Sequence, residues 1–252
     1  MEFVTYESEA ETEQSHWWFV GRRTLFGKVV RSLGLPMDAA IIDIGSSTGS
    51  NLRLLQQIGH TNIKGVDSSP VARDFCAQKG LAEVIPGDIR DLPFEDESVD
   101  LAFATDILEH VDQDDVGLKE IFRILKPGGH ALLTVPAFES LWGIQDDISL
   151  HKRRYLKPGF SQLVKTAGFD VKRSFYFNYL LFPLIWVTRL ILRILKPKIR
   201  AETDINSAFI NKVLLKLFTA DILSAEVVNP PFGVSILILG RKPNTDEDAR
   251  SQ

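Results

Sequence analysis

The sequence predicts an α/β fold in which helices cover both faces of a mostly parallel sheet. Between residues 39 and 137, short apolar runs alternate with segments whose apolar residues recur at helical spacing. Helices that connect successive strands keep those strands parallel, and parallel sheets are buried on both faces. A chain of 252 residues with 44% hydrophobic content can bury the core that this arrangement needs.

The alternation gives strands and helices in a definite chain order. Apolar runs predict strands within the segments 39–45, 62–69, 82–88, 99–106 and 130–137. Amphipathic spacing predicts helices within 50–59, 69–80 and 114–129, the last ending at Lys-Pro-Gly-Gly. A helix, a glycine stop and a strand follow over 161–177, and a final strand lies within 231–242. The stretch between them, about 178–231, is predicted as a helical insertion that serves as a lid or a docking surface.

Composition and charge limit the classes of function. We expect one domain over residues 16–240, with an acidic extension at 1–15 and a disordered tail at 241–252, both solvated. The formal net charge of −4 offers no general attraction to a polyanion, so we expect no nucleic-acid partner. The single cysteine, Cys76, excludes an internal disulfide, and the N-terminal residues lack a secretory pattern. These features predict a cytoplasmic protein.

The turn "DIGSSTG", from Asp43 to Gly49, joins the first strand to a helix. Such a turn brings backbone N–H groups close to a ligand. A P-loop would need Gly-Lys-Ser/Thr, but Gly49 is followed by Ser-Asn. A dinucleotide fingerprint needs three glycines at fixed offsets, and Ser47 interrupts that spacing. Asp43 disfavours a diphosphate and suits an ammonium group, which indicates a nucleoside that carries an amino acid.

Two further aspartates end the next two predicted strands. Asp67 follows the second strand, where a carboxylate can accept both hydroxyls of a ribose, and Asp88 follows the third, where it can meet an adenine amino group. The three aspartates form a row along the carboxyl edge of the sheet, where open α/β sheets bind ligands. The alternative is that each aspartate only caps a helix. Asp67 alone would also suit NAD.

The chain resembles the class I S-adenosylmethionine-dependent methyltransferases, especially the branch similar to ubiquinone-type methyltransferases. The motifs "DIGSSTG", "GVDSS", "GDIRDLPFEDESVDLAFATDILEHV" and "EIFRILKPGGHALLTVPA" carry the resemblance, which covers about residues 16–177 and the final strand. It implies a Rossmann-like seven-stranded sheet with the last strand antiparallel, S-adenosyl-L-methionine as cofactor and S-adenosyl-L-homocysteine as product. The implied cofactor residues are Asp43, Gly45, Ser47, Gly49, Asp67, Ser68, Asp88, Ile89 and Thr105. The family usually has glycine at the position of Ser47, so a weaker affinity for the cofactor is expected.

Methyl transfer from a sulfonium depends mainly on alignment and exclusion of water. A hydroxyl or phenol acceptor also benefits from a base, and the candidate catalytic residues are His110, His151, Tyr155 and Asp106. Asp106, Glu109 and His110 form a D-x-x-E-H cluster that is similar to the E-x-x-E-H stretch of quinone-precursor O-methyltransferases, where a divalent ion can hold a catechol. Packing or capping of the next helix explains the same residues, and we predict no metal site.

Three residues are candidates for binding the acceptor. Arg153 and Arg154 lie in the basic stretch "HKRRYLKPGF", where arginine forks suit a phosphate or carboxylate, although a solvated loop would have the same composition. Trp18 lies in "HWWFVGRR", which suits either a helix that closes over the sulfonium or simple packing onto the sheet. Adjacent tryptophans on a helix are not expected to face the same core.

The segment 180–200 indicates where the acceptor comes from. It is strongly apolar, but Arg189 interrupts it and Pro183 would kink it, so we do not expect it to span a bilayer. A basic amphipathic helix on an anionic surface fits better and predicts peripheral contact with the inner face of a membrane. The alternative is a lid buried against its own domain or a homodimer partner.

These features predict an enzyme that transfers a methyl group from S-adenosylmethionine to a small-molecule or lipid-linked acceptor, with oxygen as the candidate methylated atom. Two alternatives stay open at this point. One is a nucleotide-binding oxidoreductase, which the interrupted glycine spacing disfavours. The other is a non-catalytic protein of the same fold that binds the cofactor and docks on membranes.

Overall fold

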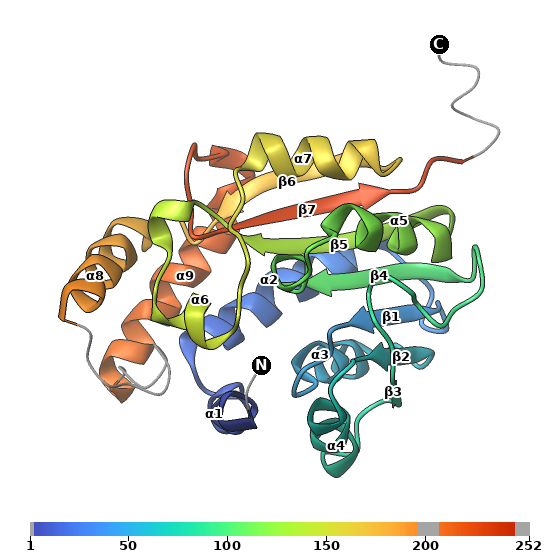
Figure 1. Cartoon of the computed structure of the whole chain (residues 1–252), viewed down its shortest axis with the longest axis horizontal. Helices are drawn as coiled ribbons and strands as arrows, with labels where there is room; N and C mark the ends of the chain where they lie inside the picture. The colour runs from blue at the N-terminus through green and yellow to red at the C-terminus, as the bar shows by residue number, and fades with distance from the viewer. Residues whose placement is uncertain (1–2, 196–206, 245–252) are drawn as a thin grey trace.

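The computed structural model describes residues 3–195 and 207–244. Its centre is a seven-stranded sheet in the order β3-β2-β1-β4-β5-β7-β6 (Figure 1). The strands are β1 (Ile41–Ile44), β2 (Ile63–Val66), β3 (Val84–Ile85), β4 (Val99–Thr105), β5 (Leu125–Pro136), β6 (Asp170–Phe177) and β7 (Ser235–Arg241). β7 pairs antiparallel with both β5 and β6, and the pairs formed by β1 to β5 are parallel. This confirms the predicted Rossmann-like α/β fold.

Helices cover both faces of the sheet because successive strand residues point to opposite sides. Ile41, Leu101 and Phe103 pack with α2 (Trp17–Leu33), α3 (Ser50–Ile58), α4 (Pro70–Gln78) and α9 (Ala208–Val228). Their neighbours Ile42 and Ala102 pack with α5 (Asp114–Ile124) and α7 (Lys157–Thr166) on the other face. Smaller elements are η1 (Leu108–His110), η2 (Glu139–Leu141) and α6 (Ile144–Ile148). The last three all lie near the carboxyl ends of the parallel strands, where they contribute to the site.

The end of α5 differs from the prediction. The helix ends at Ile124, and β5 begins at Leu125, so the Lys-Pro-Gly-Gly sequence belongs to the strand. Leu125 pairs with Val99, whereas the next pair joins His130 to Leu101. Five residues of β5 therefore correspond to two of β4. The Pro-Gly-Gly turn is absorbed as a bulge between these two pairs, and Gly128 has a φ of 81°, which glycine accepts without steric cost.

The acidic extension is a helix rather than a solvated segment. Residues Phe3–Thr12 form α1, and Glu13 just beyond it is only 1% exposed. Glu13 accepts hydrogen bonds from Lys79 at 2.8 Å and from Thr48. The prediction of a solvated extension was wrong for this part because its glutamates have buried partners in the first strand-to-helix turn. In the tail, Lys242 is 8% exposed, while residues 245–252 lie outside the described part of the chain.

The helical insertion between the last two strands is present. It contains α8 (Phe182–Leu195) and α9, and residues 196–206 between them lie outside the described part. α9 packs along α2 through Phe218, which is fully buried, whereas α8 has no buried residue. In Figure 1 the two helices lie at one end of the sheet. Within residues 3–195 and 207–244, no helix combines the length and apolarity needed to cross a membrane.

Candidate active site

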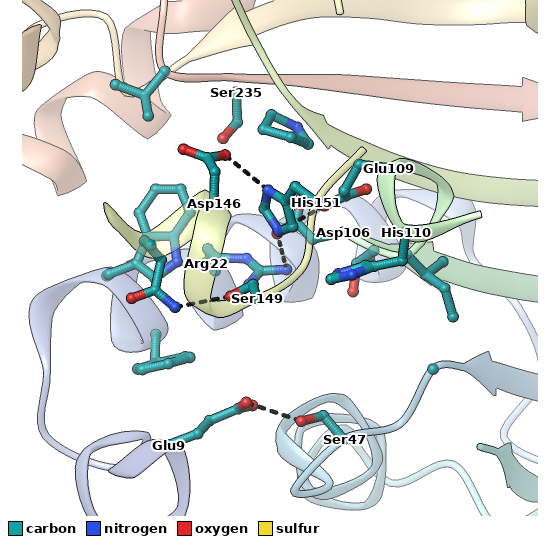
Figure 2. A pocket seen from close by; sticks show the side chains of 18 of the residues that line it. Glu9, Arg22, Ser47, Asp106, Glu109, His110, Asp146, Ser149, His151 and Ser235 are labelled. Carbon is teal, nitrogen blue, oxygen red and sulfur yellow. Dashed lines mark hydrogen bonds and ion pairs between the residues drawn. The ribbon is translucent and has the colours of Figure 1, made fainter. Parts of the chain in front are cut away.

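A cavity of about 790 Å³ lies at the carboxyl ends of the parallel strands. One end is lined by the strand-to-helix turns after β1 and β2, and the middle by acidic and histidine side chains (Figure 2). The other end is lined by apolar residues of α8 and α9. Of the predicted site residues, Trp18, Gly45, Ser47, Asp67, Ser68, Asp88, Ile89, Thr105, Asp106, His110, His151 and Arg154 line it. The fold therefore brings most of the predicted residues together.

The turn after β1 has the backbone conformation that its glycines suggest. Gly45 and Gly49 have φ values of 75° and 88°, and Ser47 between them has a φ of 47°, in the left-handed region that glycine adopts most readily. The Ser47 hydroxyl donates to Glu9 Oε2 of α1 at 2.9 Å (Figure 2). Thr48 also donates to Glu9, at 3.2 Å. These hydrogen bonds attach α1 to the turn. The Ser47 side chain, which a glycine would lack, therefore has a hydrogen-bond partner in Glu9.

Asp43 and Gly49 lie behind the cavity wall rather than in it. Asp43 is fully buried, and its Oδ1 accepts a hydrogen bond from Asn51 at 2.9 Å. Its Oδ2 has no hydrogen-bond partner within the described residues. Burial raises the pKa of Asp43 to about 6, because desolvation disfavours the charged carboxylate. A buried carboxylate with a free oxygen places negative charge directly behind the turn.

The second and third aspartates have different surroundings. Asp67 is 9% exposed, and its carboxylate accepts from the backbone N–H groups of Ser47 at 2.9 Å and Ser69 at 2.8 Å. Burial raises the pKa of Asp67. Asp88 is more exposed and forms a two-point ion pair with Arg90, at 2.9 and 2.7 Å, which lowers its pKa. A ligand at this end therefore meets Asp67 directly and competes with Arg90 for Asp88.

Asp106 and Trp18 meet through an arginine from α2. Arg22 pairs with Asp106 at 2.8 Å, and its guanidinium carbon lies 5.5 Å from the centre of the Trp18 ring. Trp17 and Trp18 both contact Phe218 at 5.5 Å, one edge-on and one stacked. The prediction that adjacent tryptophans face different cores was wrong because α9 crosses α2 at this point. Thr105 accepts a hydrogen bond from Asn51 at 3.0 Å, which links it to Asp43.

His151 is held between two buried acids (Figure 2). Its Nδ1 lies 2.8 Å from Asp146 Oδ1, and its Nε2 lies 3.9 Å from Glu109 Oε1. Burial alone would raise the pKa of Asp146, but the hydrogen bond with His151 and the charge of Arg154 hold it well below its usual range. Burial raises the pKa of Glu109 well above its usual value. The environments of these acids thus drive their pKa values apart, a pattern typical of acid–base sites.

His110 completes a group of three potential metal ligands. The ligand atoms of Glu109, His110 and His151 all lie within 4.8 Å of one another, and both Glu109 oxygens lack a hydrogen-bond partner within the described residues. Burial lowers the pKa of His110 to about 4, so this ring is neutral. Two imidazoles and one carboxylate suit zinc. Asp106, the first residue of the sequence motif, is paired with Arg22 instead.

Two further predicted residues, besides Asp43 and Gly49, do not line the cavity. Tyr155 donates to Asp114 at 2.8 Å, and burial raises its pKa, so the phenol stays protonated. Arg153 pairs with the same Asp114 at 3.0 Å and donates to the carbonyl of Asp112. Arg154 does line the cavity, but it forms a two-point pair with Asp146 at 2.9 Å. Tyr155 and Arg153 therefore support the loop, and Arg154 orients Asp146.

The sequence interpretation missed several residues that the fold brings to the site. They are Glu9, Arg22, Asp146 and Arg189. Asp146 follows no strand and belongs to no motif; it caps α6 by accepting from the Gly143 N–H at 2.7 Å. Arg189 donates to Leu141 O at 2.7 Å and lies 3.6 Å from Asp146. No local pattern marks these positions: the partners of Glu9, Arg22 and Arg189 are distant in sequence, and the partners of Asp146 that are near in sequence lie in an irregular loop without a helix or strand period.

The apolar end of the cavity is formed by the insertion. α8 contributes Leu184, Ile185, Thr188 and Leu192, and α9 contributes Ile210 and Leu214. These residues recur at helical spacing and face the same space as Trp17 and Trp18. The cavity is therefore polar at one end and in the middle, and apolar at the other end.

Comparisons with known proteins agree with this arrangement. The model of the methyltransferase domain family matches residues 42–133. The chloroplastic 2-methyl-6-phytyl-1,4-hydroquinone methyltransferase of Arabidopsis thaliana is 28% identical over 109 residues, which are 42% of this chain and 32% of that protein. The ubiquinone/menaquinone biosynthesis C-methyltransferase of Vibrio vulnificus is 29% identical over 136 residues, 49% of this chain and 51% of that protein. The chain thus spans between a third and about half of the length of these relatives.

A solved structure extends the likeness to the whole fold. An S-adenosylmethionine-dependent methyltransferase of Thermotoga maritima superposes with a TM-score of 0.57 at 21% identity, covering 96% of this chain and 100% of that one. The matched domain includes the turn after β1, Asp67, Asp88 and β4, which ends at Thr105. The domain match and these relatives show that residues 42–133 are similar to the methyltransferase domain of such enzymes, and the likeness to the solved structure shows that the whole chain shares their fold.

Proposed function

We propose that this protein transfers a methyl group from S-adenosylmethionine to a hydroxyl oxygen of a lipid-linked acceptor. The observation that carries this proposal is the polarity of the 790 Å³ cavity, whose lining includes most of the predicted cofactor residues, His151 and the apolar residues of α8 and α9. A ring bearing a hydroxyl group and an apolar chain would match the middle and the apolar end. The printed names of the relatives include a phytyl hydroquinone, which agrees with the ring and the apolar chain of such an acceptor, whereas the Vibrio vulnificus relative is named a C-methyltransferase.

The residues at the polar end suit the cofactor. Asp67 lines the cavity and keeps unused lone pairs that a ribose diol could occupy. The free Oδ2 of Asp43 behind the turn favours a ligand with a positively charged amino-acid end. Gly45 has no room for a side chain, because an added Cβ would overlap Ile107. When bound, the cofactor supplies an electrophilic methyl group on its sulfonium.

His151 is the residue that we assign as general base. Asp146 fixes the imidazole by accepting from Nδ1, which leaves Nε2 with its lone pair facing the cavity next to Glu109. Nε2 can take the proton of an acceptor hydroxyl as its oxygen attacks the methyl carbon. Trp17 and Trp18 exclude water from this region and offer aromatic faces to a cation. Asp106 is held by Arg22 and shapes the wall beside them.

The experiment combines titration calorimetry with a turnover assay. S-adenosylhomocysteine is titrated into the protein with NADH as the control ligand, and alkylphenols and hydroquinones are tested as acceptors with mass detection of the methylated product. We expect binding of S-adenosylhomocysteine, no binding of NADH, and an O-methylated product. Binding of NADH alone would favour the oxidoreductase alternative, and ligand binding without turnover on any acceptor would favour the non-catalytic one.

His151→Gln separates catalysis from cofactor binding. We expect turnover to fall by roughly 10²- to 10⁴-fold, the usual contribution of a general base, with the affinity for S-adenosylhomocysteine unchanged. His130→Gln is the matched control, since this half-buried histidine lies on β5 and does not line the cavity. Equal activity of the two variants would contradict the role of His151.

A further inference from the structure

We propose that the outer face of α8 and the first half of α9 docks on an anionic phospholipid bilayer, from which the acceptor passes directly into the cavity. The inference rests on the proposed function for the identity of the acceptor, but the docking surface itself is argued from exposure and charge. We call this surface the insertion face. It consists of the exposed apolar residues Trp186, Val187, Leu190, Ile191, Ile194 and Leu195 of α8 and Phe209, Val213 and Leu217 of α9.

The insertion face concentrates apolar side chains that ordinary packing would bury. Among the described residues, every exposed large hydrophobic side chain except Met37, Leu150 and Leu156 lies between residues 180 and 232. Ile194 is 71% exposed and Phe209 is 77% exposed. Large contiguous apolar patches are rare on monomeric soluble proteins and mark contact with a protein or a membrane. Trp186, 41% exposed, is the residue type that prefers the headgroup level.

α8 is apolar on two opposite faces. Residues 185, 188 and 192 line the cavity, whereas residues 187, 190, 191 and 194 point away from it and are exposed. Both sets follow the 3.6-residue period of a helix. A helix that is apolar all round is normally buried in a core or in a membrane. The inner face of α8 lines the cavity. Its outer apolar face is exposed to solvent and would be buried only against a membrane or another protein.

The charged residues of α8 and of the first part of α9, residues 208–220, are all basic. Arg193, Lys212 and Lys216 are exposed, and within α8 and residues 208–220 of α9 there is no aspartate or glutamate. Arg189 is turned inward to Asp146. Basic residues beside an apolar stripe are the pattern of helices that lie in the interface of anionic membranes. A second copy of this chain would bring the same basic residues together across a two-fold axis, which disfavours self-association through this face.

The cavity opens between α8 and α9, beside the insertion face. Leu184 and Ile210 line the cavity, and they are also 56% and 48% exposed. They belong to α8 and α9 respectively, so the space between these helices reaches the surface there. A chain held in the bilayer could therefore extend through this opening towards His151 without crossing water.

Vesicle flotation of the full chain tests the proposal. Vesicles of phosphatidylcholine alone are compared with vesicles of equal parts phosphatidylcholine and phosphatidylglycerol. We expect flotation with the anionic vesicles only. High salt should lower the partition coefficient by roughly fivefold for each basic residue that contacts the anionic surface. Ile194→Glu should weaken the partitioning by about tenfold or more. Met37→Glu, which adds the same charge at an exposed apolar residue in the connection between α2 and β1, should float like the parent.

Ligand binding and gel filtration show whether a loss of flotation reflects a loss of membrane docking. Binding of S-adenosylhomocysteine should be unchanged in Ile194→Glu, because Ile194 does not line the cavity, and this shows that the variant is folded. A protein that binds this ligand but stays with the soluble fraction would overturn membrane docking and leave the methyltransferase proposal intact. Equal flotation of Ile194→Glu and Met37→Glu would also overturn it. So would a dimer on gel filtration that Ile194→Glu dissociates, since the face would then be covered by a second copy.

Discussion

Asp43 is an isolated charge in the interior, and its surroundings make its ionisation costly. Its Oδ2 has no hydrogen-bond partner within the described residues, and burial raises its pKa from 3.8 to about 6. Because the folded pKa exceeds the unfolded one, the ionised carboxylate lowers the free energy of unfolding above about pH 6, and this penalty disappears as the pH falls below the unfolded pKa.

Asp43→Asn should therefore stabilise the protein at neutral pH. The amide keeps an oxygen for Asn51 and carries no charge. We expect the free energy of unfolding to rise by about 3 kcal/mol at about pH 7.5 and by roughly half as much at about pH 5, measured by urea denaturation. The same variant should bind S-adenosylhomocysteine more weakly. A stabilisation that does not depend on pH would contradict the assigned pKa shift.

The triplet of Glu109, His110 and His151 has the spacing of a metal site, and its role can be separated from that of a base. We expect EDTA to leave turnover unchanged, because Asp106, the carboxylate that the sequence motif would supply, is already paired with Arg22. The assay is run on protein dialysed against EDTA, with zinc added back to one sample. A loss of activity that zinc restores would show that the triplet holds a metal.

At the scale of elements, the turn between β1 and α3 depends on glycine for two separate reasons. Gly49 has a φ of 88°, and an added Cβ would overlap Leu81 and lie 3.0 Å from Cys76 Sγ. Gly80 at the end of α4 has a φ of 63°, but an added Cβ would meet no atom within 4 Å. The two glycines share backbone strain and differ in packing.

Gly49→Ala should cost clearly more stability than Gly80→Ala. We expect a loss of about 1 kcal/mol for Gly80→Ala, from the left-handed conformation alone. Gly49→Ala should lose roughly 2 to 4 kcal/mol, because overpacking adds to the same strain. Chemical denaturation of both variants measures the difference. Similar losses would mean that Leu81 and Cys76 move aside without cost.

At the scale of the whole molecule, one cavity is lined by the turns after β1 and β2, by the acids and histidines around His151, and by the apolar residues of α8 and α9. The apolar end predicts that acceptors with longer alkyl chains have lower KM values, by up to about fourfold for each buried methylene. Leu214→Asn should weaken this dependence, because Leu214 lines the apolar end, and should leave a chainless acceptor unaffected. Leu223→Asn, on the exposed side of α9, is the control. A KM that does not change with chain length would exclude a lipid-linked acceptor.

Local patterns were sufficient for the sheet, most helix positions and the polar end of the cavity. Strand and helix periods are properties of a few consecutive residues, and Asp67 and Asp88 reach the carboxyl edge because parallel strands all end there. The same turns indicated a nucleoside that carries an amino acid, and the resemblance of the motifs to a known family implied S-adenosylmethionine. Even the insertion between β6 and β7 could be read from the spacing of two strand patterns.

Only the tertiary structure placed Asp146 against His151, Arg22 against Asp106 and Glu9 against Ser47. Each of these contacts joins segments whose relative position depends on how loops and helices pack, and no local period encodes it. Packing likewise turned Arg153 and Tyr155 away from the cavity and towards Asp114. The sequence determined which groups stand at the ends of the strands, whereas the packing of helices and loops decided which charges neutralise one another and which remain available for chemistry.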